Sequence, residues 1–253
     1  MDLGLQDRVY IVTAASRGLG FATAQALVAD GAKVVVTGRD EDALDRAVAA
    51  LGGADRAFGV VADNGEPDTA PRLVAAARER FGRLDGLMVS VGGPPAGPVL
   101  DATDEQWTAA FESVFLGALR LARAAAEVLG EGGAIGFVLS SSVRQPLAGL
   151  GISNGLRPGL AMVAKTLADE LGPRGIRVFG VLPGKIDTER VRSLDALSAD
   201  PEAAREAASR TIPLRRYGRP EEFGKAAAFL LSPAASYVTG TMVPIDGGLI
   251  RAL

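Results

Sequence analysis

Short apolar runs alternate with longer segments of helical periodicity along almost the whole chain. The runs stand at residues 9–13, 33–37, 57–62, 84–89, 134–139 and 176–182. Each is nearly continuous in its apolar character, which is typical of a strand buried on both faces of a sheet. The pattern therefore predicts parallel strands covered on both sides.

The segments between these runs repeat their apolar residues at spacings of three and four, which indicates helices. They cover residues 21–30, 41–51, 69–81, 103–129 and 159–171, and a further helix opens at Arg219-Pro220-Glu221-Glu222. Alternation of strands and helices predicts an α/β fold with a doubly wound parallel sheet of about seven strands. A closed eight-stranded barrel fits less well, because too few strands are present and a glycine-rich turn comes first in the chain.

No linker, repeat or low-complexity segment divides the 253 residues, so we expect a single domain over 1–253. The longest interruption is residues 188–217, which are charged and helix-prone. Because this segment follows the end of the sixth run, we expect it to form a lid over a site at that edge of the sheet.

A glycine-rich turn, Thr13-Ala14-Ala15-Ser16-Arg17-Gly18-Leu19-Gly20, joins the first run to the first helix. Gly18 and Gly20 would let the backbone approach a pyrophosphate at the helix N-terminus. We therefore expect a nucleotide to contact Thr13, Ser16, Arg17, Gly18, Leu19 and Gly20. A tight turn without a ligand is the alternative.

Four stretches together resemble the short-chain dehydrogenase/reductase family: the glycine-rich turn, Pro183-Gly184-Lys185-Ile186-Asp187-Thr188, Tyr237-Val238-Thr239-Gly240 and Val243-Pro244-Ile245-Asp246-Gly247-Gly248. The carboxyl-terminal third closely resembles β-ketoacyl-carrier-protein reductases. The resemblance covers nearly the whole chain, and it implies a Rossmann-type fold, a nicotinamide dinucleotide cofactor and a homotetramer or homodimer. Ala14 stands where the family has glycine, so we expect it to keep a negative φ.

The choice of nucleotide depends on the end of the second run, Thr37-Gly38-Arg39. No acidic residue stands at Arg39 to bind a ribose 2′-hydroxyl. Arg39 and Arg17 could instead clamp a 2′-phosphate, which favours NADP over NAD. The alternative is two solvated arginines. Asp40 precedes a predicted helix and is a better candidate for its N-cap.

The resemblance adds further cofactor contacts. Asp63 and Asn64 end the third run, where the family holds adenine with an Asp, and Ser90-Val91-Gly92-Gly93 stands where the family has Asn-Asn-Ala-Gly. After the sixth run, the family's Pro-Gly turn holds the nicotinamide with backbone groups and reaches the phosphates with a Thr. The implied contacts are Asp63, Asn64, Gly92, Pro183, Gly184, Ile186 and Thr188.

The catalytic pattern is incomplete, which indicates a divergent branch lacking the full tetrad. The family uses a Ser, a Tyr, a Lys four residues after the Tyr, and an Asn that supports a water relay. Counting back without a gap from residues 164–171 places the Tyr position at Ser153 and the Lys position at Arg157, while the Asn position falls on Val114. Only the serine is kept, as Ser142.

The resulting candidate catalytic residues are Ser142, Ser153, Arg157 and Lys185. Lys185 enters as a replacement acid, because a desolvated lysine can exchange protons near neutrality; a solvated loop lysine is its alternative. If Asn154 is a helix N-cap, Pro158 lies one position past N3. The Ser153–Arg157 pair would then be a capping region with a surface arginine.

The amino-acid composition excludes several classes of catalytic and metal site. The chain has no His and no Cys, so a Ser-His-Asp triad, a thiolate nucleophile and a His or Cys metal site are excluded. A net charge of −3 without a basic stripe gives no reason to expect a nucleic-acid partner. No apolar stretch approaches the roughly 18 residues of a membrane span. Since the amino terminus lacks signal-peptide features, a cytoplasmic location is expected.

We therefore expect an NADP(H)-dependent oxidoreductase that reduces a small-molecule carbonyl compound, either a ketone or a 3-oxoacyl thioester. A catalytically inactive nucleotide-binding or partner-binding protein is the alternative. Non-redox chemistry of the halohydrin dehalogenase type fits less well, because those proteins keep the tyrosine and lose the nucleotide loop. The arginines of residues 188–217 are interpreted as a solvated face: Arg190, Arg192, Arg205, Arg210, Arg215 and Arg216.

Overall fold

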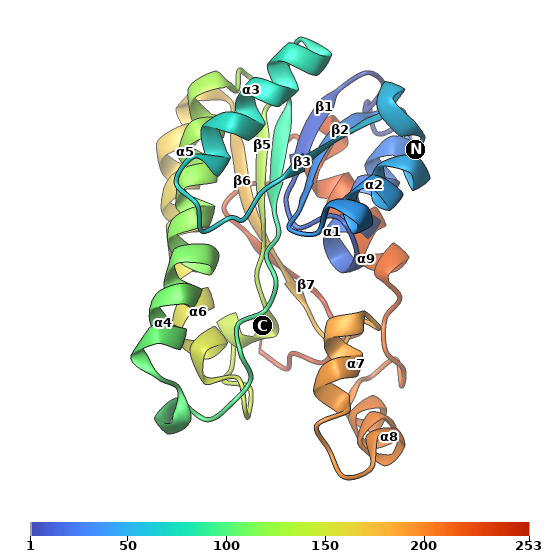
Figure 1. Cartoon of the computed structure of the whole chain (residues 1–253), viewed down its shortest axis with the longest axis vertical. Helices are drawn as coiled ribbons and strands as arrows, with labels where there is room; N and C mark the ends of the chain where they lie inside the picture. Colours follow the sequence, from blue (N-terminus) through green and yellow to red (C-terminus); the bar gives the residue numbers. More distant parts are fainter. Residues whose placement is uncertain (1, 253) are drawn as a thin grey trace.

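The computed structural model describes residues 2–252, and a seven-stranded parallel sheet runs through them (Figure 1). Its order is β3-β2-β1-β4-β5-β6-β7. The strands are β1 (Val9–Val12), β2 (Lys33–Gly38), β3 (Ala57–Val61), β4 (Gly86–Val89), β5 (Ala134–Val138), β6 (Arg177–Pro183) and β7 (Met242–Ile245). The predicted doubly wound sheet is confirmed. The individual runs did not identify β7, a four-residue edge strand that contains Pro244.

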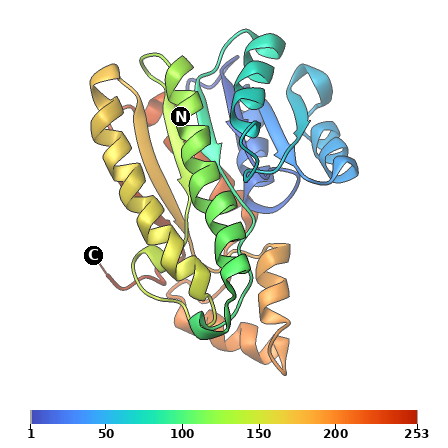
Figure 2. The same ribbon diagram turned by 60° about the vertical axis from the view of Figure 1, so that its left-hand side comes forward.

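Helices cover both faces of the sheet (Figures 1 and 2). One layer holds α1 (Gly18–Ala29), α2 (Glu41–Ala50) and α9 (Pro220–Leu231), and the other holds α3 (Thr69–Phe81), α5 (Gly117–Val128) and α6 (Gly151–Leu171). Alternate strand residues enter the two cores: Val9 and Ile11 pack in one cluster, Tyr10 and Val12 in the other. Burial on both faces explains the continuous apolar runs.

The predicted helix 103–129 is interrupted. It consists of α4 (Asp104–Ala110), the π-helical turn η3 (Phe111–Leu116) and α5. Thr103 caps α4 by accepting a hydrogen bond from the Gln106 backbone N–H. A π turn inserts one extra residue per turn and is frequent at functional sites. Here it includes Val114, at which the resemblance predicted the place of the relay asparagine.

The helix α6 begins at Gly151, eight residues before the predicted start at residue 159. The residue at its N-cap position is Leu150, whereas the Asn154 side chain bonds to the backbone N–H and carbonyl of Leu147. The Asn154 N-cap hypothesis is therefore wrong. Pro158 lies inside the helix and removes one backbone hydrogen bond, but the packing of Ile152, Leu156 and Leu160 continues through it.

Two helices occupy the predicted lid segment. Thr188 caps α7 (Glu189–Asp195) and Asp200 caps α8 (Pro201–Thr211). Both extend beyond the end of β6, as Figure 1 shows in orange. Short 3₁₀ turns complete the chain: η1 (Gly53–Asp55), η2 (Val99–Asp101), η4 (Ser141–Val143), η5 (Gly172–Arg174) and η6 (Pro233–Ala235). Within residues 2–252, none of the helices has the length and apolar character to cross a bilayer.

Candidate functional site

The glycine-rich turn that follows β1 contains residues with left-handed backbone conformation. Gly18 has φ +62°, and a Cβ at Gly20 would lie only 2.5 Å from the Ala14 carbonyl oxygen. Ala14 has φ +46°, so the expected negative φ is wrong. Two hydrogen bonds to the end of β2 explain the conformation: Ala14 N–H donates to Thr37 Oγ1 (3.0 Å) and Ala15 N–H to the Thr37 carbonyl (2.7 Å).

The first turn of α1 has free donors at the carboxyl edge of the sheet. Its N-cap residue, Arg17, makes no side-chain capping bond, and the first turn holds no acidic side chain. The helix dipole and the unpaired N–H groups favour an anion at such a terminus. A Cβ built at Gly18 would meet only the Thr188 methyl group, at 3.9 Å. The turn therefore leaves room for a phosphate group to approach its backbone.

The side chains of Thr13 and Asn64 connect the base of this turn to Ser90 by hydrogen bonds. The Thr13 hydroxyl donates to the Ser90 carbonyl (2.5 Å) and accepts from the Ser90 N–H (2.9 Å). The Asn64 amide donates to Thr13 Oγ1 (3.3 Å) and to the same Ser90 carbonyl (2.9 Å). Both side chains are buried. Their hydrogen bonds join the end of β1 to the end of β4 and so fix the position of the turn.

The residues expected to bind the adenosine half of the cofactor lie close to one another. Arg39 Nη1 lies 3.5 Å from Asp63 Oδ2, and both side chains reach solvent. Ser16 packs against Gly38, which directly precedes Arg39. As expected, Asp40 caps α2 by accepting from the Ala43 N–H (2.8 Å). The structure thus brings the end of β2, the end of β3 and the glycine-rich turn together at one edge.

The Pro183–Thr188 turn forms the opposite wall. Gly184 is required there, because a Cβ would lie 2.6 Å from that of Asp246. The Ile186 N–H donates to the Gly184 carbonyl (3.1 Å), and the Thr188 N–H donates to the Ile186 carbonyl (2.7 Å). This winding places the Thr188 side chain next to Gly18. The two predicted phosphate-contact segments therefore face each other.

Arg17 crosses from the glycine-rich turn to the first residue of α7. Its Nη1 lies 2.6 Å from Glu189 Oε2, and both side chains are largely exposed. An ion pair in this position is strongly screened by water. It therefore leaves the arginine available to a stronger anion. Gly92, after β4, has no neighbouring atom within 4 Å of the position of a Cβ, so the space beside it is open. The region bounded by the glycine-rich turn, Gly92 and the Pro183–Thr188 turn is hereafter called the cleft.

Three predicted catalytic residues lie at the end of β5 and on α6. Ser142, in η4, has a buried hydroxyl without a hydrogen-bond partner among the described residues. Ser153 and Arg157 are both 6% exposed, and their i, i+4 spacing places them on one face of α6, against which η4 packs. The Arg157 guanidinium donates to the Val138 carbonyl through Nη1 (2.7 Å), which excludes the surface arginine of the alternative interpretation.

Val114, the residue expected from the resemblance at the place of the relay asparagine, lies in an apolar cluster. It is 1% exposed and packs with Ala110, Ile152 and Leu156, while Trp107 covers the cluster. An aliphatic side chain in such a cluster cannot bind a water molecule. The Val114 side chain therefore has no polar group with which to hold a relay water.

Lys185 is neither desolvated nor unpaired, in contrast to the environment expected of it as a replacement acid. Its ammonium lies 3.2 Å from Asp195 Oδ1 on α7 and is 37% exposed. It also lies 5.8 Å from the centre of the Tyr217 ring. Burial and the neighbouring Asp195 carboxylate raise the pKa of Tyr217 to about 12, so this phenol stays neutral at physiological pH.

Arg190 is the site residue that sequence reasoning missed. It was interpreted as part of a solvated face, yet its Nη2 donates to the Pro94 carbonyl after β4 (2.6 Å). A Cβ at Gly93 would lie 2.9 Å from Arg190 Nε, so the side chain runs directly over that glycine. Helical periodicity on α7 alone could not reveal a contact made across the mouth of the cleft.

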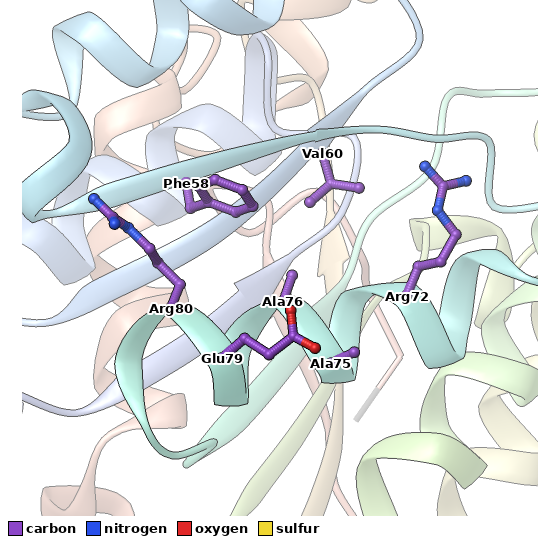
Figure 3. Close-up of a pocket in the computed structure, with 7 residues that line it drawn as sticks. All are labelled: Phe58, Val60, Arg72, Ala75, Ala76, Glu79 and Arg80. Carbon is purple, nitrogen blue, oxygen red and sulfur yellow. The ribbon is translucent and has the colours of Figure 1, made fainter.

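Two grooves lie outside this cleft or at its border. One of about 280 Å³ is lined by residues 95–98, Asp101, Ala102, Gln106 and Ile152, next to Ser153. The other, of about 450 Å³, lies between β3 and α3 at the far edge of the sheet (Figure 3). Phe58 and Val60 form its apolar wall, with Arg72 and Arg80 at its two ends. No predicted site residue lines this second groove.

Comparison with known sequences shows similarity to oxidoreductases over almost the whole chain. The family model described as enoyl-(acyl carrier protein) reductase matches residues 13–250. An uncharacterized oxidoreductase of Methylorubrum extorquens is 36% identical over 249 residues, which are 97% of this chain and 98% of the relative. Human dehydrogenase/reductase SDR family member 4 is 35% identical over 248 residues, or 96% of this chain and 88% of the relative.

Solved structures match over the full length. A short-chain dehydrogenase/reductase from Brucella melitensis, described as a glucose/ribitol dehydrogenase, has a TM-score of 0.93 at 31% identity and 100% coverage of both chains. L-sorbose reductase from Gluconobacter frateurii, solved with NADPH and L-sorbose, has a TM-score of 0.93 at 30% identity, again with 100% coverage of both chains.

Proposed function

Because the chain belongs to the short-chain dehydrogenase/reductase family, we propose that it is an NADPH-dependent reductase of a small-molecule carbonyl compound with an atypical catalytic site. The observation that carries this proposal is the convergence of the uncapped α1 terminus, the Arg39–Asp63 pair and Thr188 around one open cleft. Ketones and 3-oxoacyl thioesters both fall in the proposed substrate class.

The residues of the cleft fit a dinucleotide. Backbone groups of Ser16–Gly20 would hold the pyrophosphate, since Gly18 leaves the approach open. Arg17 and Arg39 would hold a 2′-phosphate, exchanging their exposed carboxylate partners for a more strongly charged group. Gly92, the backbone of Pro183–Ile186 and the Thr188 side chain would hold the nicotinamide half. The L-sorbose reductase neighbour was solved with NADPH, which supports the same cofactor class.

When bound, the nicotinamide supplies the hydride that reduces the carbonyl carbon. The chain itself must position the carbonyl oxygen and deliver one proton to it, which completes the alcohol. The Ser142 hydroxyl has no partner in the described chain, so it can donate a hydrogen bond to that oxygen. Ser153 adds a second hydroxyl on the adjoining helix. Neither serine is a strong enough acid to provide the proton itself.

The proton comes either from the Lys185 ammonium, which forms an ion pair with Asp195, or from a water molecule held by Ser142. The segment α7–α8 acts as the lid in this proposal, because it carries Asp195, Thr188 and Glu189 to the mouth of the cleft. Closing this segment would exclude bulk water from the carbonyl carbon.

The cofactor is tested by titrating NADPH and NADH and following quenching of Trp107, the one tryptophan of the chain. NADPH should bind at least about tenfold more tightly than NADH, which corresponds to about 1.4 kcal/mol. Arg39→Leu should remove most of that difference. The matched control is Arg46→Leu, which changes an exposed arginine on α2. Equal affinities of the unmodified protein for both cofactors would refute the NADP preference.

Turnover is tested with NADPH and a panel of ketones, aldehydes and 3-oxoacyl thioesters. Lys185→Ala should lower kcat by about 100-fold or more if the ammonium is the acid, while NADPH affinity stays the same. Lys165→Ala, an exposed lysine on α6, is the control. Unchanged turnover in Lys185→Ala assigns the proton to water.

A non-catalytic nucleotide-binding protein is the second candidate. The observation that favours it is the apolar cluster around Val114, together with an aliphatic hydroxyl at Ser153. This candidate predicts that NADPH binds but is not oxidised by any member of the panel.

A further inference from the structure

Two guanidinium groups stand over the ends of neighbouring strands. Arg157, on α6, donates to the Val138 carbonyl at the last residue of β5, and Arg190, on α7, donates to the Pro94 carbonyl in the loop after β4. Because β4 and β5 are adjacent and parallel, their carboxyl ends meet at the same edge of the sheet. Two different helices thus bring cations to one part of the cleft.

Neither guanidinium forms an ion pair with a carboxylate of residues 2–252. Other arginines of the chain have a carboxylate partner or more hydrogen-bond acceptors. Arg192 and Arg205 on α7 and α8 both pair with Asp187, and the buried Arg177 donates to the carbonyls of four residues, Leu230, Leu231, Ser232 and Val238. A guanidinium has five N–H donors, and Arg157 uses its Nη1 on one protein acceptor. Donors of both groups therefore remain available to a ligand.

A buried cation without a counter-ion is costly, and a second cation nearby increases that cost. Burial, and to a lesser degree the charge of Arg190, lowers the pKa of Arg157 to about 10. Partial burial also lowers the pKa of Arg190. A bound anion would offset both effects, because it supplies the missing counter-charge to each guanidinium.

We infer that Arg157 and Arg190 together bind a carboxylate of the substrate, so that the preferred substrates are oxo acids. This inference rests on the proposed reductase function. The Ser142 hydroxyl follows the same strand as Val138 and has no partner of its own, so it can bind the oxo group while the guanidinium groups bind the acid group. One molecule that carries both groups would satisfy all three side chains.

The position of Arg157 favours a substrate over the phosphates of the cofactor, whereas Arg190, held at Pro94 after β4, lies one strand nearer to the glycine-rich turn. The glycine-rich turn follows β1, and the sheet order β1-β4-β5 places the Val138 carbonyl two strands away from it. At about 4.8 Å per strand, this separation is about 10 Å. Arg17 and Arg39 already provide cations on the phosphate side.

The test uses isothermal titration of acetoacetate, 2-oxobutanoate and levulinate against their neutral methyl esters, with and without saturating NADPH. At least one acid should bind about tenfold or more tightly than its ester, as expected for charge-assisted hydrogen bonds. Arg190→Gln should weaken binding of the acid about tenfold, leaving ester and NADPH affinities within twofold. The control is Arg192→Gln, which lies two residues further along α7 and is directed at Asp187.

Arg157→Lys provides a second variant, because it keeps the charge but loses the planar donor pattern. It should also weaken binding of the acid without changing affinity for the ester. Equal binding of acid and ester, or no binding of any acid, would overturn the inference. A parallel loss of NADPH affinity in Arg190→Gln would also overturn it, since the pair would then hold the cofactor pyrophosphate.

The same experiments distinguish failure of the proposed reductase function from failure of the proposed carboxylate site. If NADPH does not bind, or is not oxidised, while acid binding still depends on Arg190, the carboxylate site stands and the reductase proposal fails. If NADPH reduces neutral ketones as readily as oxo acids, the reductase stands and the carboxylate site fails.

Discussion

Ala14 shows how much depends on one backbone angle. A non-glycine residue in the left-handed region costs roughly 1–2 kcal/mol, yet here two hydrogen bonds to Thr37 hold the turn in that conformation. The methyl group is accommodated because Ala14 lies at the partly exposed start of the turn. The strain is thus retained at the entrance of the proposed cofactor site.

Ala14→Gly should therefore stabilise the protein by about 1 kcal/mol, since glycine adopts this φ without strain. For a chain of this size, that gain corresponds to a melting temperature about 2–4 °C higher, which calorimetry can measure. The control is Ala15→Gly, which removes a fully buried methyl group and should destabilise the protein. Equal destabilisation by both substitutions would show that the angle at Ala14 is not strained.

Sequence reasoning at the residue scale succeeded where one local rule applies. Asp40 was expected to cap α2 and does so, because the capping bond closes within three residues. It failed where a contact joins distant segments. Arg190 reaches a carbonyl 96 positions earlier in the chain, and Thr37 fixes Ala14 from the next strand. Periodicity contains no information about such contacts.

At the scale of elements, the positions of β1 to β6 were predicted within about two residues, because the central strands are buried on both faces, whereas the partly exposed β7 was not identified. The start of α6 was missed by eight residues, since Pro158 suggested a helix boundary. Tertiary packing explains the difference: Gly155 lies against Trp107, and Gly159 lies against Phe115. These glycines are contact points with α4 and the π turn, and larger side chains would separate the helices.

Asp187 connects both helices of the segment α7–α8 to the turn that precedes them. Its carboxylate accepts from Arg192 Nε (2.9 Å) and Arg205 Nη1 (3.1 Å), and these hydrogen bonds lower the pKa of Asp187 to about 2. Arg205 also lies over the Tyr217 ring, 4.3 Å from its centre. A group whose folded pKa is depressed stabilises the fold above its unfolded pKa of about 3.9. That contribution is lost as the pH falls from about 4 to about 2.

Asp187→Asn should loosen α8 at neutral pH. Hydrogen exchange of the α8 amides, measured by mass spectrometry at pH 7, should accelerate about two- to fivefold, which corresponds to about 0.5–1 kcal/mol for partly exposed ion pairs. The melting temperature should also decrease less steeply below pH 4 than in the unmodified protein. Glu206→Gln, which breaks an exposed pair with Arg210, is the control and should change neither result. An unchanged acid dependence in Asp187→Asn would contradict this role.

At the scale of the whole molecule, α5 and α6 lie side by side on one face of the sheet (Figure 2). This face has exposed apolar side chains: Met162 on α6 is 68% exposed and Phe111 in the π turn is 43% exposed. Phe111 stacks on Phe115 at 5.3 Å between ring centres, and Phe115 lies against Gly159, one turn before Met162. The patch therefore extends from α6 to the π turn that precedes α5. Exposed apolar patches of this kind mark interaction surfaces.

We expect this face to join copies of the chain, so light scattering should give a mass that is a multiple of 26.0 kDa. Met162→Glu buries a charge in that contact and should raise the dissociation constant about tenfold or more, or about 1.4 kcal/mol. Leu197→Glu is the matched control, because Leu197 is equally apolar and 74% exposed but lies between α7 and α8. A 26.0 kDa particle for the unmodified chain, or equal dissociation in both variants, would rule out this interface. Since Gly155 and Gly159 set the spacing between α6 and its neighbours, the same packing that buries Ser153 and Arg157 also shapes the surface tested here.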